Sequence, residues 1–236
     1  MERRKETPLS GGLRTCVSIG LVGMALVALS GCVSSEKYEA VVTERDQLLE
    51  DQVRLNSQVS ETEQQKRDAS MKAEAAEAEI ARQQQVYGNL QKTFANEQKA
   101  NQVKIEMMKS GVKVNLANEI LFASGSADLN ESGLDVLTRA AAELKKSSYQ
   151  TLVAGFTDDI KISGKLVHQY PSNWELAGAR AASVVRLLEQ EGVATAQLVA
   201  VSFGQNNPVA ANDSSEGRSK NRRIEIILRP VPVTMN

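Results

Sequence analysis

The sequence predicts an α/β (α+β) sandwich domain, with helices on one face of a mixed sheet, preceded by a long α-helical coiled coil. Two observations predict this order. Residues 33–110 contain no proline and a single glycine, Gly88, and their apolar residues recur every seven positions. From residue 111 onward, strand-like and helix-like segments alternate. The low aromatic content, 4%, also indicates that only part of the chain builds a core.

Residues 1–31 have the pattern of a signal peptide. Basic residues precede an apolar run at 16–29, which is shorter than the ~20 residues that span a membrane. The run ends in Leu-Ser-Gly before Cys32, which resembles the lipobox of bacterial lipoproteins, where cleavage precedes an acylated cysteine. We therefore expect a lipid on Cys32. Val33 is not the aspartate that commonly retains lipoproteins at the inner membrane, so we expect the periplasmic face of the outer membrane. An uncleaved anchor is the alternative.

Residues 32–110 are expected to form a helical stalk. One heptad core position holds Tyr38, Val59, Ala73, Ile80, Tyr87 and Phe94, and the other holds Val41, Leu48, Leu55, Ala69, Ala76 and Leu90. Polar residues interrupt this seam at Arg45, Gln52, Thr62, Lys66 and Gln83. One helix cannot bury such a seam alone, so we expect self-association through a coiled coil. A charged single helix that acts only as a spacer is the alternative.

Residues 111–229 have the composition of a folded domain, with Ser110 and Gly111 predicted to end the helix. Strands are expected at 112–116, 120–122, 150–156, 198–203 and 222–228, with loops at 157–171 and 205–220. A helix capped by Asn130 should bury Leu134, Leu137, Ala141 and Leu144. Residues 230–236, which contain two prolines, should form an extended tail.

A second helix, expected at 173–191, has the clearest local signals. Ser172 and Glu175 have the spacing of a capping box, and Asn173 is a further capping candidate. Ala177, Ala181, Val184 and Leu188 form one apolar stripe. Asn173 and Arg180 lie seven residues apart, near the positive end of the helix dipole. We expect this turn to receive a carboxylate.

Composition excludes several other classes of site. The only cysteines are Cys16 and Cys32, and the only histidine is His168, so neither a disulfide framework nor a zinc site is expected. The formal net charge of −1 argues against nucleic acid as a partner. No motif in the chain calls for a cofactor.

Four segments resemble the motifs of the OmpA-like C-terminal domain. They begin at Ile120 (ILFASGSA), Gly155 (GFTD), Asn173 (NxxLxxxRA) and Asn221 (NRRIE). This family includes outer-membrane porins, peptidoglycan-associated lipoproteins and flagellar stator proteins. The resemblance covers residues 111–229 and implies non-covalent binding of peptidoglycan, through the diaminopimelate of its stem peptide, by a domain that is not catalytic.

The resemblance also implies roles for particular residues. Asp158 would pair with the ammonium group of the ligand, and Arg180 would hold its carboxylate. The pocket would be shaped by Asn173, Thr157 and Leu176, and the closing arginine pair would be Arg222 and Arg223. Structural alternatives exist for the charged residues. Asp158 could bond loop amides, and Arg180 could be a solvated helix arginine or form an internal ion pair. Strand alternation would send Arg222 and Arg223 to opposite faces.

Three functions from different classes follow. The first is a non-enzymatic tether that is lipid-anchored at Cys32 and binds peptidoglycan. The second is a stator-like component with an uncleaved N-terminal anchor, although no acidic residue lies between residues 9 and 35. The third is a wall-degrading enzyme that uses Asp158 and Asp159 as an acid/base pair. Consecutive residues after a strand diverge, which disfavours the enzyme.

Overall fold

The computed structural model describes residues 34–230. The expected signal peptide, Cys32 and the last six residues of the tail lie outside this range. The chain divides into two units, residues 1–71 and 72–236, and the long helix α2, Ser35–Thr93, contributes to both. Within residues 34–230, none of the helices combines the length and the apolar character needed to cross a membrane.

Helix α2 fits the expected stalk. In the first unit the apolar seam residues face solvent, since Tyr38, Val41, Leu48, Leu55 and Val59 are each more than half exposed. In the second unit the same heptad positions change environment. Gln83, Leu90 and Phe94 are buried, and the last two belong to the core of the globular domain.

The predicted boundary between residues 110 and 111 is wrong. Helix α2 ends at Thr93, the short helix α3 covers Ala95–Lys99, and strand β1, Val103–Met108, pairs antiparallel with β2, Gly111–Ala117. Val103 and Ile105 point into the core, and this alternation defines β1. Residues 110 and 111 therefore belong to a hairpin. Gly111 is required there, because its φ is +145° and a Cβ would lie 1.8 Å from the carbonyl oxygen of Leu228.

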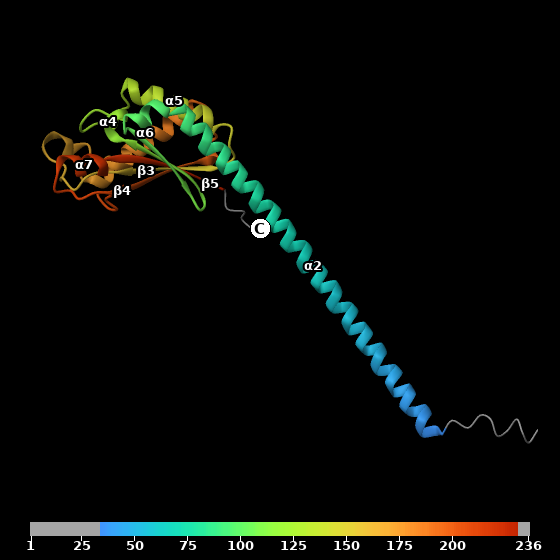
Figure 1. The fold of residues 1–236 in the computed structure, drawn as a ribbon. Helices are drawn as coiled ribbons and strands as arrows, with labels where there is room; N and C mark the ends of the chain where they lie inside the picture. Colours follow the sequence, from blue (N-terminus) through green and yellow to red (C-terminus); the bar gives the residue numbers. More distant parts are fainter. Residues whose placement is uncertain (1–33, 231–236) are drawn as a thin grey trace, which may run out of the picture. The chain divides into compact units, whose positions relative to one another are not determined.

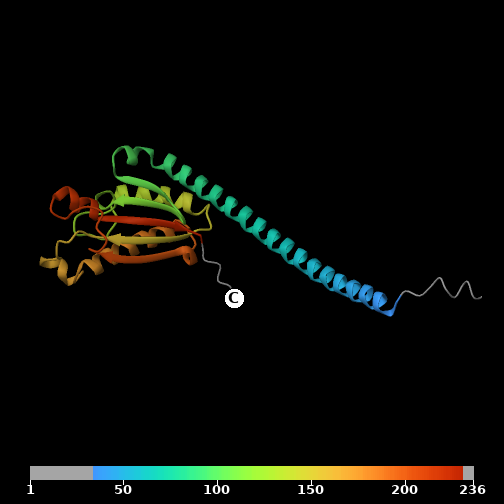
Figure 2. The ribbon, with the colours of Figure 1, turned by 60° about the horizontal axis from the view of Figure 1, so that its bottom comes forward.

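The sheet has five strands in the order β1-β2-β5-β3-β4. Strands β3 (Gln150–Phe156) and β4 (Leu198–Gly204) are parallel, whereas β5 (Arg223–Arg229) runs antiparallel to both β2 and β3. Helices α5 (Glu131–Leu144) and α6 (Asn173–Gln190) cover one face of this sheet (Figures 1 and 2). The predicted mixed sheet with helices on one face is confirmed.

Helix α6 matches its prediction closely. Ser172 is the N-cap and forms the capping box with Glu175, so Asn173 is not the capping residue. The stripe formed by Ala177, Ala181, Val184 and Leu188 is completely buried. Short 3₁₀ turns, η1 (Gly164–His168) and η2 (Thr195–Gln197), precede and follow this helix.

Three other predictions need correction. Residues 120–122 do not form a strand, because helix α4 covers Asn118–Leu121. Leu134 of α5 is 43% exposed, since Gly133 instead packs against the backbone of Leu121, where a Cβ would lie 2.6 Å from the carbonyl oxygen. The expected loop at 205–220 contains helix α7, Ser215–Asn221, so β5 begins one residue later than expected.

Candidate functional site

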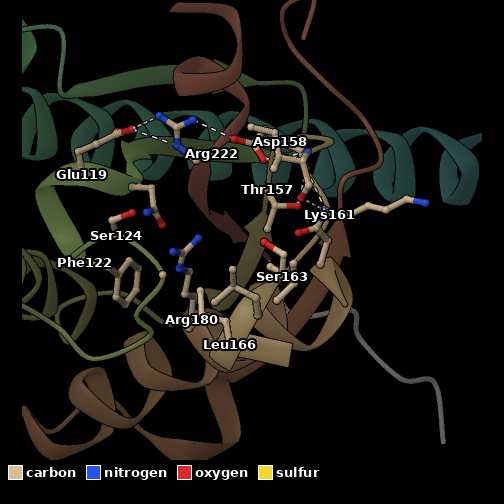
Figure 3. A pocket seen from close by; sticks show the side chains of 16 residues that line it. Glu119, Phe122, Ser124, Thr157, Asp158, Lys161, Ser163, Leu166, Arg180 and Arg222 are labelled. Carbon is tan, nitrogen blue, oxygen red and sulfur yellow. Dashed lines mark hydrogen bonds and ion pairs between the residues drawn. The ribbon is translucent and has the colours of Figure 1, made fainter. Parts of the chain in front are cut away.

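A pocket of about 410 Å³ lies just beyond the carboxyl end of β3. Its walls come from the segment after β3, helix α4 and the residues that follow it, the first turns of α6, and Arg222 just before β5. Figure 3 shows this pocket from close by. The end of a strand is where open α/β sheets commonly bind ligands, and the sequence predicted a site at this position.

Asp158 is 8% exposed and is held at both carboxylate oxygens. Its Oδ1 accepts a hydrogen bond from the backbone N–H of Ile160 at 3.2 Å, and its Oδ2 accepts one from Nη1 of Arg222 at 2.9 Å. The loop-amide role that the sequence left open is therefore present. It occupies only part of the accepting capacity of the carboxylate, which has about four lone-pair sites.

Arg222 bridges two carboxylates, as the dashed lines in Figure 3 show. Its Nη1 binds Asp158, and its Nη2 donates to Oε1 of Glu119 at 2.7 Å. Burial lowers the pKa of Arg222, but the hydrogen bonds to the two carboxylates outweigh burial, so that its pKa is raised. Arg222 therefore holds Asp158 and Glu119 in position, and its charge is already balanced within the protein.

Arg180 has no such balance. Its side chain is 97% buried, its Nε donates to the backbone oxygen of Ser126 at 2.9 Å, and its guanidinium carbon lies 5.5 Å from the ring centroid of Phe122. Among residues 34–230, no carboxylate lies within ion-pair distance of Arg180, so the internal ion pair that the sequence left open is absent there. Burial lowers the pKa of Arg180 to about 10. The guanidinium points into the pocket in Figure 3.

Asn173 and Thr157 fix the loop that carries Asp158. Nδ2 of Asn173 donates to the backbone oxygens of Asp158 at 3.3 Å and Ile160 at 3.0 Å. Oγ1 of Thr157 donates to the same backbone oxygen of Asp158 at 2.9 Å. Leu176 is buried beside Ala127 and provides an apolar wall. All three residues line the pocket, as the resemblance implied.

Arg223 does not belong to this site, which corrects the assignment of both closing arginines to the ligand. Its Nε binds Oε1 of Glu225 at 2.7 Å, and its guanidinium lies 3.7 Å from the ring centroid of Phe156. Arg223 and Glu225 are both less than one-tenth exposed. Strand alternation explains the difference: Arg222 meets the pocket, whereas Arg223 is committed to a buried ion pair.

Several lining residues were missed by the sequence reasoning. Asn118 and Glu119 come from α4, which was predicted as a loop and strand, and Ser124 comes from the turn after it. The segment 160–170 contributes Ile160–Ser163 and Leu166, but His168 is exposed and outside the lining. Asp159 is also exposed and does not line the pocket, so it forms no pair with Asp158 there.

Comparison with known families identifies the domain. Residues 121–222 match the OmpA family. The chain therefore contains an OmpA family domain. Motility protein B of Helicobacter pylori (strain ATCC 700392 / 26695) is 35% identical over 125 residues, which cover 52% of this chain and 48% of that protein. The probable lipoprotein YiaD of Escherichia coli K12 is 32% identical over 130 residues, covering 54% of this chain and 56% of YiaD.

Two further similarities bear on function. The peptidoglycan-binding protein ArfA of Mycobacterium tuberculosis is 31% identical over 122 residues, or 51% of this chain and 35% of ArfA. The solved structure of the cell wall anchor of the T6SS from Pseudomonas aeruginosa is 35% identical, with a TM-score of 0.56, and covers 60% of this chain and 97% of that one. The chain spans about half the length of the first curated relatives that it matches.

Proposed function

We propose that this protein is a non-enzymatic tether of the cell envelope that binds peptidoglycan through the diaminopimelate of its stem peptide. The observation that carries the proposal is the buried guanidinium of Arg180, which faces a pocket without a carboxylate partner among the described residues. A buried cation is costly unless an anion pairs with it. A ligand carboxylate would supply that anion, and ArfA, a peptidoglycan-binding relative, supports this choice of ligand.

The free end of diaminopimelate presents an ammonium group and a carboxylate on one carbon. Its receptor therefore needs an anion and a fork of donors within one pocket. Arg180 supplies a planar fork that can bind a carboxylate through two parallel hydrogen bonds, which a lysine cannot. Asp158, held by Ile160 and Arg222, supplies the anion. A stem peptide would thus satisfy both charges with protein groups already in place.

The anchor forms the other end of the tether. The lipobox-like sequence before Cys32 and the likeness to the probable lipoprotein YiaD support cleavage and acylation at this cysteine. Two or three acyl chains would hold the protein firmly, since each buried CH₂ contributes ~0.8 kcal/mol. Outer-membrane attachment on the periplasmic side would leave the domain free to reach the cell wall.

We also propose that two or more copies associate through the first part of α2. Large apolar residues at successive heptad positions, including Leu48 and Leu55, are more than half exposed. The same stripe is buried against the domain at Leu90 and Phe94, so those positions are not available to a second chain. Self-association would therefore be confined to residues 38–80.

The test of the binding function is co-sedimentation with purified cell-wall sacculi. Arg180→Met should lose binding, because the ligand carboxylate loses the fork of donors that Arg180 supplies. Arg186→Met is the matched control, since Arg186 lies on the same helix but is exposed and outside the pocket. Binding by Arg180→Met at the level of the wild type would refute the assignment of the site.

A stator-like role is the alternative, and the likeness to Motility protein B favours it. That role would need residues 1–31 to remain attached as a membrane anchor. Mass spectrometry of the protein isolated from membranes separates the two proposals. Acyl groups on an N-terminal Cys32 support the tether, whereas an intact N-terminus supports the stator-like role.

A further inference from the structure

Asn118, the first residue of helix α4, lines the pocket but belongs to none of the four sequence motifs. Its side chain is only 3% exposed, and its amide oxygen Oδ1 is buried without a hydrogen-bond partner in the part of the chain that the structure describes. Only two other side-chain atoms share this condition within residues 34–230, and they belong to Glu97 and Asn115, neither of which lines this pocket.

An unpaired buried acceptor is costly, because folding removes the water that would otherwise donate to it. Such a group can nevertheless serve binding if a ligand supplies the missing donor. The acceptor must then lie where a donor of the ligand arrives.

Diaminopimelate, the ligand of the proposed function, has an ammonium group, which presents three N–H donors and no acceptor. Asp158 cannot accept all three. Its Oδ1 already accepts from the N–H of Ile160, and its Oδ2 already accepts from Arg222. About two of its lone-pair sites remain, so an ammonium group buried against Asp158 needs one more acceptor.

Asn118 and Asp158 line the same pocket and are joined through Arg222. The backbone N–H of Asn118 donates to the carbonyl oxygen of Arg222 at 3.1 Å, and the guanidinium of Arg222 binds both Asp158 and the next residue of α4, Glu119. One arginine thus joins the start of α4 to the carboxylate that would receive the ammonium group. These contacts tie the backbone of Asn118, through Arg222, to the carboxylate of Asp158.

We propose that Oδ1 of Asn118 is the additional acceptor for the ammonium group of the ligand, and that Asn118 therefore helps to select ligands with a free amine. This inference rests on the proposed binding of diaminopimelate. It adds a specificity-determining residue that a comparison limited to the four motifs would miss.

Asn118→Leu tests the inference, because leucine has a similar volume and offers no acceptor. We expect this variant to bind a stem tripeptide ending in diaminopimelate about tenfold more weakly than the wild type, as measured by titration calorimetry on the full chain. For a tripeptide that lacks the terminal amine, measured by NMR titration, wild type and variant should bind equally. The unfolding temperature of the variant should not fall, because an unpaired buried acceptor has been removed.

Asn115→Leu is the matched control. It also removes an unpaired buried amide oxygen, but Asn115 lies in β2, away from this pocket, so ligand affinity should not change. Two results would overturn the inference: equal binding of the amine-bearing peptide by wild type and Asn118→Leu, or an equal loss of affinity for the peptide without the amine. Failure of the wild type itself to bind either the tripeptide or sacculi would instead overturn the proposed function.

Discussion

Replacing Arg180 with methionine should stabilise the protein while abolishing its ligand binding. The wild-type side chain places a positive charge in a nearly inaccessible position, where it contacts one backbone oxygen and one aromatic ring and has no ion-pair partner among residues 34–230. Methionine fills similar space without a charge. Under the proposed function, the gain in stability and the loss of binding would have the same origin, because only the ligand would pair with this charge.

The size of the effect follows from the pKa of Arg180. Burial lowers this pKa from 12.5 to about 10, and one pKa unit corresponds to 1.36 kcal/mol, so the charged form costs about 3 kcal/mol in the folded state. Methionine would give up the hydrogen bond to Ser126 and the contact with the ring of Phe122, each worth about 1 kcal/mol. The net expectation is a free energy of unfolding that rises by about 1 kcal/mol, or an unfolding temperature that rises by about 2–4 °C.

The pH dependence has a definite sign. The folded-state pKa of Arg180 is lower than that of the unfolded chain, so the cost of its charge is complete below pH 10. Above pH 10 the folded protein begins to release the proton of Arg180. The cost of the charge then declines as the pH approaches the pKa of the unfolded state. The stability advantage of Arg180→Met should therefore be constant from pH 6 to 9 and should shrink above pH 10.

Urea denaturation at pH 7, followed by circular dichroism, measures this advantage. Arg186→Met provides the baseline, because Arg186 is exposed on the same helix and should change the free energy of unfolding little. A loss of more than about 1 kcal/mol in Arg180→Met, beyond that baseline, would refute the reasoning. It would identify Arg180 as a residue that stabilises the folded domain and not as one whose charge is unpaired until an anion binds.

Three further predictions concern other parts of the molecule. Arg223→Met should lower the free energy of unfolding by about 3–5 kcal/mol in urea denaturation, because it leaves Glu225 buried and unpaired, yet the folded variant should still bind sacculi. Burial raises the pKa of Tyr149 to about 12, so the stability of the wild type relative to Tyr149→Phe should fall as pH rises from 10 to 12. Leu48→Glu should abolish self-association in analytical ultracentrifugation, whereas Gln47→Glu, outside the heptad seam, should not.

The features that the sequence predicted well depend on neighbouring residues. The start of α6 rests on the reciprocal bonds of Ser172 and Glu175, only three residues apart, and its buried stripe follows from helical periodicity. Asp158 and Arg180 were found because their motifs resemble a known family. Both residues do line one pocket.

The features that the sequence reasoning missed depend on pairing between separate segments of the chain. Strand β1 follows directly from a helical stretch, and only its pairing with β2 and the burial of Val103 and Ile105 distinguish it from further helix. Strand alternation predicted that Arg222 and Arg223 would lie on opposite faces, but it did not predict the contact of Arg222 with Asp158. Asp158 lies 64 residues from Arg222, and no local pattern specifies that contact.

The charges of the pocket indicate the class of ligand that it can accept. Asp158, Arg222 and Glu119 form one connected group with a formal charge of −1, and Arg180 provides +1 on its own. Lys161 also lines the pocket, but its ammonium group points away from the other labelled side chains in Figure 3. We therefore leave its charge out of this sum. A dianion such as phosphate would leave the acidic group unpaired, and a simple amine would leave Arg180 unpaired. A ligand with adjacent ammonium and carboxylate groups pairs both, which favours an amino acid centre over either ion alone.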